Sequence, residues 1–368
     1  MRYKLKDIFD LQIGKTPSRN NSEYWNTEDH KWISIADLTR TGKYISETKE
    51  YLSENAIQKS GIKVIPANTV VMSFKLSIGK TAITAEDMYS NEAIMAFLDK
   101  HVVEVLPEYI LYMFKFKNWD EGSNEAVMGK TLNKAILSEI EIDICPIEEQ
   151  RVIVDVLDKM MLALENRENE LFLLDDLIKA RFVEMFGNSV LNEKGWITDT
   201  VDNLCKEIYG GGTPSKVHPE YYKDGDIPWV SSKDMKTDIL TDSQIKINQM
   251  GVENSTARMV PVNSVIMVIR SGILKHTLPV AINAVPITVN QDLKVFIPSE
   301  RILTRFLAVQ FKMHEKDILT GVRAVTADNI EVNSLKQRKL IVPSIELQQE
   351  YVLFLEQVDK SKVVEIIK

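Results

Sequence analysis

A series of short motifs occurs twice in this chain of 368 residues, in the same order in both halves. Thr-Pro-Ser, for example, stands at residues 16–18 and again at 213–215. One such match would be chance, but an ordered series with nearly constant spacing is not. The spacing of about 200 residues is too long for a solenoid of small repeats. The sequence therefore predicts two homologous domains in tandem.

The other duplicated motifs extend over most of each half. Paired first copy with second, they are Tyr24-Trp25 with Tyr221-Tyr222, Trp32-Ile33-Ser34 with Trp229-Val230-Ser231, Asp37 with Asp234, Ile65–Met72 with Val260–Met267, Asn91-Glu92 with Asn290-Gln291, and Pro146–Gln150 with Pro343–Gln348. The predicted parts are two domains at residues 1–145 and 191–342, a helical spacer at 146–190 and a distal helix at 343–368.

Composition is that of a globular protein. The chain is 44% hydrophobic and 27% charged, which excludes a disordered or fibrous class. No apolar run reaches the roughly 18–20 residues of a membrane helix, and the start lacks a signal-peptide core, so we expect a cytoplasmic protein. Two cysteines, Cys145 and Cys205, are too few for a disulfide framework or a four-ligand zinc site. The net charge of −8 decides nothing about nucleic acid, because a near-neutral domain can carry a basic face.

Each copy has the pattern of a mixed α/β (α+β) domain. Val64–Phe74 and Arg258–Ile269 are rich in Val and Ile and contain Pro and Asn near their starts, which predicts strands. Glu108–Lys117 and Arg301–Met313 have apolar residues three and four apart, which predicts short amphipathic helices.

A long helix is predicted over Glu148–Phe186. Pro146 and two glutamates suit its start, and no Pro or Gly follows until Gly187. At ~1.5 Å per residue it is about 58 Å long. Its apolar residues recur at heptad-like steps and predict one interface stripe: Val154, Leu157, Met161, Leu164, Leu171, Ile178 and Phe182.

The predicted partner of this stripe is a second helix over Glu346–Lys368. Its apolar residues are Val352, Leu355 and Val358. Because this helix is much the shorter of the two, pairing would be incomplete, and part of the first stripe would remain available to other proteins. The alternative is that the long helix packs on its own globular domain.

Motifs for catalysis are missing from the sequence. Gly-Lys-Thr occurs at residues 14–16, 79–81 and 129–131, but each lacks the earlier glycine of a phosphate-binding loop. There is no His-Glu-x-x-His, Gly-x-Ser-x-Gly or Gly-x-Gly-x-x-Gly motif, nor an amino-methyltransferase loop. An acid/base pair among scattered carboxylates stays open, although the recurring Asp37 and Asp234 are explained more simply by turns or caps. We expect no catalysis and no metal site.

In this order, the duplicated motifs resemble the specificity (S) subunit of a type I restriction–modification enzyme, over essentially the whole chain. The resemblance implies two tandem target-recognition domains, each followed by a helix, with the two helices pairing as an antiparallel coiled coil. It also implies double-stranded DNA with a bipartite site, two methyltransferase (M) subunits and endonuclease/translocase (R) subunits as partners. S-adenosylmethionine, ATP and Mg would then belong to those partners, and this chain would hold no cofactor.

Two diverged domains on a rigid spacer can read two half-sites, with helix length setting their separation. Two alternatives remain open at this point. One is the recognition subunit of a type IIB-like restriction–modification enzyme, which shares the same domains. The other is a protein scaffold that does not bind DNA.

Base reading needs donors and acceptors on loops, and phosphate contacts need basic or small polar residues near glycine. Three loops in each copy meet these needs. The candidates in the first copy are Lys15, Thr16, Ser18, Arg19, Lys75, Ser77, Lys80, Lys130, Thr131 and Asn133. Those in the second copy are Thr213, Ser215, Lys216, Arg270, Ser271, Lys275, Arg323, Thr326 and Asn329.

These candidates carry different weights. The first loop has an equally good structural explanation, because Thr-Pro-Ser is the same in both copies whereas base readers should differ. The second loop varies more, and Arg270 is the leading base-contact candidate, with a surface salt bridge as the competing interpretation. Trp32 and Trp229 are expected in the core rather than as stacking platforms for bases.

Overall fold

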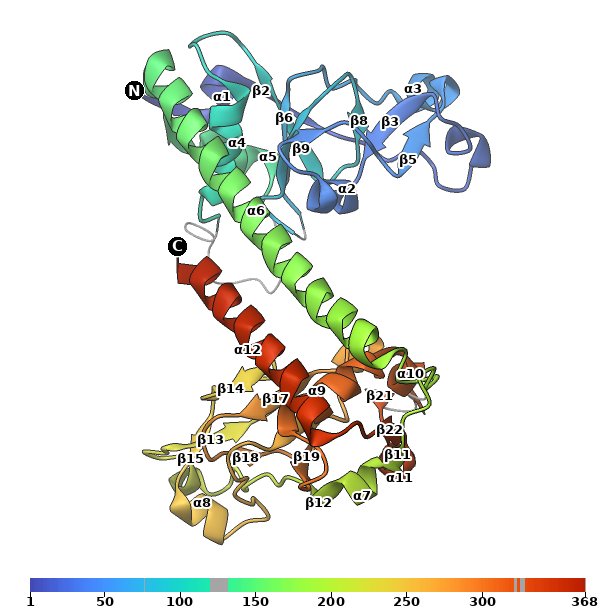
Figure 1. The fold of residues 1–368 in the computed structure, drawn as a ribbon. Helices are drawn as coiled ribbons and strands as arrows, with labels where there is room; N and C mark the ends of the chain where they lie inside the picture. The colour runs from blue at the N-terminus through green and yellow to red at the C-terminus, as the bar shows by residue number, and fades with distance from the viewer. Residues whose placement is uncertain (76, 120–131, 321–322, 325–327, 368) are drawn as a thin grey trace. The chain divides into compact units, whose positions relative to one another are not determined.

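The computed structural model describes residues 1–75, 77–119, 132–320, 323–324 and 328–367, without the side chains of 323–324, 328 and 363–367. The chain divides into two compact units, residues 1–166 and 167–368 (Figure 1). Among the described residues, no helix is long and apolar enough to cross a membrane.

The first unit is built on two sheets. The larger has the strand order β2 (Phe9–Ile13), β9 (Ile94–Asp99), β6 (Val70–Ser73), β7 (Thr81–Thr84) and β4 (Tyr44–Ile45). The smaller has the order β5 (Glu50–Leu52), β3 (His30–Ile33) and β8 (Tyr89–Ser90), while β1 (Arg2–Lys4) pairs with β10 (Glu141–Asp143). The helices are α1 (Leu5–Ile8), η1 (Ser22–Tyr24), α2 (Ile35–Arg40), α3 (Glu54–Ser60), α4 (Pro107–Phe116) and α5 (Lys134–Glu139).

The second unit repeats both sheets and the terminal strand pair of the first, strand for strand. Its larger sheet has the order β12 (Cys205–Gly210), β19 (Leu293–Pro298), β16 (Val265–Val268), β17 (Val280–Asn283) and β14 (Ile239–Leu240). The smaller sheet is β15 (Lys246–Ile247), β13 (Ile227–Val230) and β18 (Thr288–Val289), while β11 (Thr198–Thr200) pairs with β22 (Lys339–Ile341) and β20 (Arg323–Ala324) with β21 (Asp328–Asn329). The helices are α7 (Val201–Leu204), η2 (Pro219–Tyr221), α8 (Gln249–Glu253), η3 (Gly272–Lys275), α9 (Thr304–Met313), α10 (Glu315–Thr320) and α11 (Val332–Gln337). The prediction of two homologous mixed α/β domains is confirmed.

The central strands β6 and β16 start later than predicted, after the duplicated Pro-x-Asn segments. Asn68 and Asn263 both have a left-handed backbone, with φ of 60° and 65°. Asparagine tolerates this conformation better than most residues, and it breaks an extended chain. The strands β6 and β16 therefore start only after this turn.

The helix that follows the first domain, α6 (Ile147–Phe186), is 40 residues long and close to its predicted bounds. Its first half corrects the prediction of a single stripe for a partner helix. Val154, Leu157 and Met161 pack against the core of the first domain instead. The 3–4 spacing of apolar residues that suits a coiled coil suits packing on a domain equally well. Leu164 is 57% exposed, and Leu171 is half-buried.

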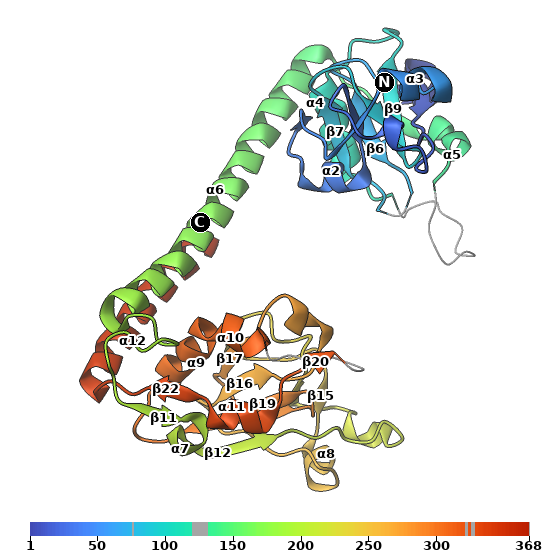
Figure 2. The ribbon, with the colours of Figure 1, turned by 90° about the vertical axis from the view of Figure 1, so that its right-hand side faces the viewer.

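The second half of α6 meets the distal helix α12 (Ile345–Ile367) within the second unit (Figure 2). Asp175 pairs with Lys362, and Arg181 pairs with Glu350. Since positions rise along α6 while they fall along α12, the two helices run antiparallel. Val358 of the predicted interface is buried. Four more predicted interface residues belong to the core of this unit or pack against it: Ile178, Phe182, Val352 and Leu355.

Each helix is fixed to its own domain by a duplicated glutamine, a role that the sequence did not predict. Gln150 and Gln348 are fully buried. The Gln150 amide accepts from the backbone N–H of Leu106 (2.9 Å) and donates to two backbone carbonyls. The Gln348 amide accepts from the N–H of Leu303 (2.9 Å) and donates in the same way. Leu106 and Leu303 are the N-cap residues of α4 and α9, so the same bonds join the same elements twice.

Candidate nucleic-acid interface

The first duplicated loop lies close to a turn that follows the last strand of the small sheet. This turn connects β8 to β9 in the first domain and β18 to β19 in the second. Gly14 and Gly211 lie so near this turn that an added Cβ would come within 2.2 Å and 1.8 Å of its carbonyl oxygens. The N–H of Lys15 donates to the oxygen of Ser90 (2.8 Å). In the second domain, the N–H of Gly212 likewise donates to the oxygen of Val289, the last residue of β18 (3.0 Å). The recurrence of glycine in both copies therefore has a structural cause.

The duplicated tryptophans are buried and bond to the backbone of the same loop. Trp32 is 2% exposed and Trp229 is 7% exposed. Their indole N–H groups donate to the backbone oxygens of Lys15 (3.1 Å) and Gly212 (2.9 Å). The expectation that both tryptophans belong to the core is confirmed.

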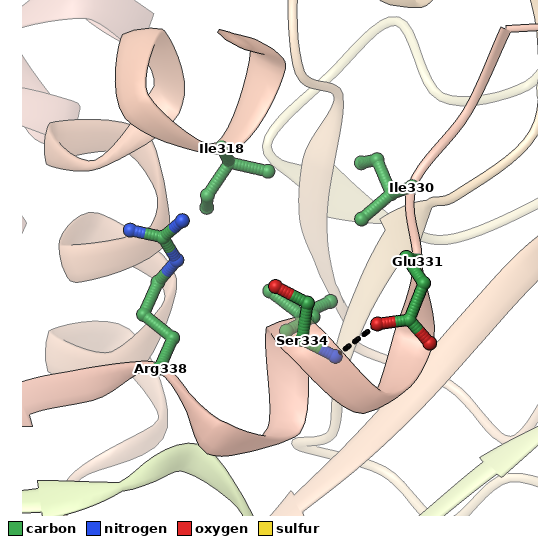
Figure 3. Close-up of a pocket in the computed structure, with 6 residues that line it drawn as sticks. Ile318, Ile330, Glu331, Ser334 and Arg338 are labelled. Carbon is green, nitrogen blue, oxygen red and sulfur yellow. Dashed lines mark hydrogen bonds between the residues drawn. The ribbon is translucent and has the colours of Figure 1, made fainter. Parts of the chain in front are cut away.

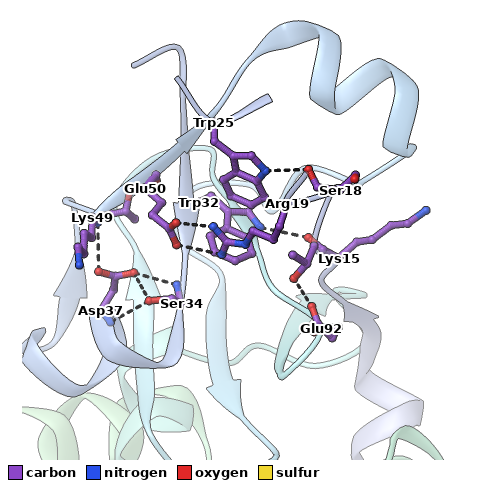
Figure 4. A network of polar contacts seen from close by, with 12 residues as sticks. Lys15, Ser18, Arg19, Trp25, Trp32, Ser34, Asp37, Lys49, Glu50 and Glu92 are labelled. Atoms are coloured by element: carbon purple, nitrogen blue, oxygen red, sulfur yellow. Dashed lines mark hydrogen bonds and ion pairs between the residues drawn. The ribbon is translucent and has the colours of Figure 1, made fainter. Parts of the chain in front are cut away.

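In the first domain, the polar side chains of this loop contact protein groups (Figure 4). The Arg19 guanidinium pairs with Glu50 (Nη2 to Oε2, 3.1 Å), and its carbon lies 3.8 Å from the ring centroid of Trp25. The Trp25 indole N–H donates to the oxygen of Ser18 (3.0 Å). Lys15 donates to the backbone of α3 and Thr16 donates to Glu92.

In the second domain, the threonine contact recurs while the other side chains of the loop differ. Thr213 donates to Gln291, as Thr16 does to Glu92. Ser215 accepts from the backbone N–H two residues on (3.3 Å), and Lys216 is exposed. The loop backbone is thus a shared structural turn, while the outward side chains differ.

The second candidate loop follows β6 in the first domain and β16 in the second, and its first residue bonds to the same turn. The N–H of Phe74 donates to Ala93 (3.0 Å), and that of Ile269 donates to Asp292 (2.9 Å). In the first domain the Lys75 ammonium lies 5.3 Å from the Phe74 ring centroid, and Ser77 and Lys80 are exposed.

Arg270 takes part in the surface salt bridge that was the competing interpretation. Its guanidinium lies 2.7 Å from the Asp292 carboxylate and is 47% exposed. The contact of this guanidinium with a DNA base stays a prediction. Ser271 caps η3 by accepting from Ile273, and Lys275 ends the same short helix.

The third loop is only partly described. Lys130, Thr131, Thr326 and the side chain of Arg323 lie outside the described residues. Asn133 accepts from the N–H of Ile136 (2.9 Å) and caps α5, so its carbonyl has a structural task.

Asn329 forms a backbone bridge with Arg270, which brings the second and third loops of the second domain together.

The duplicated aspartates are caps, as expected. Asp37 accepts from the backbone N–H groups of Ser34 (2.9 Å) and Lys49 (3.2 Å). Asp234 accepts from Ser231 (2.8 Å) and Gln244 (2.8 Å).

A small cavity of about 50 Å³ lies beside α11 (Figure 3). Ile318, Ile330 and Leu335 supply its apolar walls, and Glu331 is engaged with the backbone N–H of Ser334. Its volume suits water rather than a nucleotide or an organic cofactor. Among the described residues, no group of three His, Cys, Asp or Glu side chains is placed to hold a metal ion.

The duplicated pair at 91–92 and 290–291 was not assigned to the site from sequence. The structure places it in the turn that both candidate loops contact. The sequence does show this pair as a duplicated motif. Residues that adjoin the pair along the chain do not reveal which loops it contacts in the fold.

Comparison with known proteins gives consistent matches. The family model described as "Type I restriction modification DNA specificity domain" matches residues 1–171 and 193–368. The type I restriction enzyme MjaIX specificity subunit of Methanocaldococcus jannaschii is 25% identical, over 95% of this chain and 84% of the relative. The EcoR124I/EcoR124II specificity subunit of Escherichia coli is 38% identical over 41% of this chain and 38% of its own length.

Solved structures show the same fold at low identity. A chain from a structure on the assembly and conformational transition of the type I R-M system matches with a TM-score of 0.57 and 15% identity, over 99% of this chain and 91% of that one. The type I restriction–modification S subunit from M. genitalium matches with a TM-score of 0.51 and 13% identity, over 100% and 93%.

Proposed function

This chain belongs to the type I restriction–modification DNA specificity family, and from that membership we propose how its two domains divide the reading of DNA. Each domain reads one half of a bipartite site. The observation that carries this proposal is a scaffold repeated strand for strand, with side chains on its loops that differ between the copies. A shared scaffold places both sets of loops alike, and different side chains select different bases.

The proposed task of α6 is to set the number of unspecified base pairs between the half-sites. The helix starts in one unit and ends in the other, without a Pro or Gly to bend it. Helical geometry fixes half-site spacing in other DNA-binding proteins.

The proposed partners are two methyltransferase subunits, with endonuclease/translocase subunits in the full complex. Exposed apolar side chains on α6 support such docking, because several large exposed hydrophobic side chains on one helix favour contact with protein. They include Leu164, Phe172 and Leu173, which are 57%, 62% and 64% exposed. S-adenosylmethionine, ATP and Mg would bind those partners, and this chain would perform no catalysis. Family membership favours neither the type IIB-like alternative nor a scaffold that does not bind DNA.

The experiment is to map methylated bases in DNA modified by the reconstituted complex. The expected result is two specified blocks with a gap of fixed length. A second chain lacking residues 163–169 shortens α6 by about 10 Å while changing its helical phase by only about 20°. A gap set by the length of this helix should become shorter in the modified DNA. One contiguous recognition sequence, or a gap that ignores the deletion, would contradict the proposal.

A further inference from the structure

We propose that Glu92 and Gln291 are specificity-determining residues at equivalent positions, with Glu92 selecting cytosine in one half-site and Gln291 selecting adenine in the other. This inference rests on the proposed function, because it needs each domain to read its own half-site. It concerns a duplicated position to which neither the family match nor the sequence motifs assign a role.

The two side chains stand at the same point of the same turn. The side-chain oxygens of Asn91 and Asn290 accept from the backbone N–H two residues on, at 3.0 Å and 3.1 Å. The backbone N–H groups of these asparagines donate to β3 and β13, at 3.1 Å and 2.9 Å. Such Asx turns fix the backbone of the residue in between. Glu92 and Gln291 are therefore presented alike, and both are exposed.

This turn is where the first two candidate loops of each domain meet. Thr16 donates its hydroxyl to Glu92, and Thr213 donates its hydroxyl to Gln291. The second loop bonds to the residue that follows Glu92 or Gln291, as described above. Glu92 and Gln291 therefore each bond to the first loop and stand one residue before the backbone oxygen that the second loop bonds.

Neighbouring groups favour the ionised form of Glu92. The hydrogen bond from Thr16 lowers the pKa of this carboxyl, and the positive charges of Lys75 and Arg19 lower it further. Glu92 is therefore an ionised acceptor, and adjacent cations reduce its repulsion from phosphates. Gln291 is neutral and offers both a donor and an acceptor.

These two chemistries select different bases in the major groove. A carboxylate accepts from the N4 amino group of cytosine, whereas a glutamine amide pairs with N6 and N7 of adenine together. Because the turn is the same in both domains, the difference in preference follows from one carboxylate oxygen replaced by one amide nitrogen.

The test is a reciprocal exchange in the full chain reconstituted with its methyltransferase subunits. Glu92→Gln and Gln291→Glu keep the size of the side chain and the oxygen that accepts from threonine. Modified sequences are selected from a randomised DNA library and read by methylation sequencing. Glu92→Gln should change one base pair of one half-site from cytosine towards adenine, by about 5- to 150-fold. Gln291→Glu should change one base pair of the other half-site in the opposite direction.

Matched controls are Glu23→Gln and Gln244→Glu, which make the same chemical exchange at exposed positions away from the turn. They should leave both half-sites unchanged. Glu92→Ala is the second test, because it removes the acceptor and should make the same base pair unspecified.

The outcomes separate this inference from the proposed function. A wild-type complex without a bipartite site contradicts the proposed function itself. A wild-type complex with a bipartite site, whose preferences all survive Glu92→Gln, Gln291→Glu and Glu92→Ala, overturns only the role of these two residues. Changes in both half-sites from one substitution would overturn it as well.

Discussion

The two domains are alike in their buried polar contacts and different at the tips of their loops. Gln150 and Gln348 bond to corresponding backbone groups, and Asp37 and Asp234 cap corresponding turns. By contrast, Arg19 stacks on Trp25 and pairs with Glu50 in the first domain only. A buried amide left without its partners costs free energy, whereas an exposed side chain can change at little cost. Hydrogen bonding therefore preserves the scaffold while the loops diverge.

The largest effect is expected from the buried glutamines. Gln150→Ala leaves the N–H of Leu106 and two backbone carbonyls without partners, and should destabilise the first domain by about 4 kcal/mol. Gln348→Ala should destabilise the second domain by a similar amount. Hydrogen exchange resolved by peptide measures each domain separately in the full chain.

The controls are Gln58→Ala and Gln249→Ala, one in each domain. Both glutamines are exposed and bond to a glutamate one helical turn away. They should change stability by less than about 0.5 kcal/mol. If Gln150→Ala and Gln348→Ala differ widely from each other, the two scaffolds are not energetically equivalent.

A pH effect should distinguish the second domain from the first. His314 ends α9 and is 2% exposed, and neither ring nitrogen has a hydrogen-bond partner among the described residues. Burial, and then the nearby charge of Arg338, lower the pKa of His314 from 6.5 to about 4. At the corresponding end of α4 stands Lys117, which is exposed.

As the pH falls, His314 takes up a proton in the unfolded chain near pH 6.5 but in the folded chain only near pH 4. Its contribution to the free energy of unfolding is therefore fully present above pH 6.5 and is lost as the pH drops towards 4. The loss is on the order of 3 kcal/mol and should appear in the second domain. The variant His314→Leu should remove this part of the pH dependence, measured by unfolding between pH 7 and pH 4. An unchanged slope in His314→Leu would show that other groups cause the acid sensitivity.

The basic residues at the start of the second loop should act on separate half-sites. Arg270→Ala should cost about 1–3 kcal/mol at one half-site if the guanidinium leaves Asp292 for a guanine. Lys75→Ala should weaken only the other half-site. Methylation sequencing of both variants measures this, and equal loss in both half-sites would refute the assignment of one domain to each.

Local chemistry made much of the fold predictable. Pro146 and Gly187 bracket α6 closely, because their backbone preferences act within one or two residues. The duplicated Trp and Asp positions were expected in the core and at caps, and the structure agrees. These assignments depend on neighbours in sequence, which the sequence displays.

Contacts between distant residues could not be predicted in the same way. The apolar spacing of Val154 and Leu157 is compatible with a partner helix and with a domain surface, and only the fold decides between them. The pairing of Arg270 with Asp292 likewise depends on a turn that returns beside the second loop. For the same reason, the place of Glu92 between two loops appears only in the structure.

The smallest effect is expected at the first loop, where the structural and DNA-reading explanations carried equal weight. Arg19 is 48% exposed, so removing its contacts in Arg19→Ala should cost the first domain only about 0.5–1 kcal/mol. Lys216→Ala should change the stability of the second domain by less than about 0.5 kcal/mol. Hydrogen exchange of each domain measures both values.

The same two variants should nevertheless weaken DNA binding, each at its own half-site, because a phosphate can replace Glu50 as the partner of Arg19. Because each cation that meets a phosphate releases counterions, both contributions should weaken as the salt concentration rises. Binding of the reconstituted complex at two salt concentrations measures this weakening. A stability loss above about 2 kcal/mol in Arg19→Ala, with DNA binding unchanged, would make this loop a structural turn and nothing more.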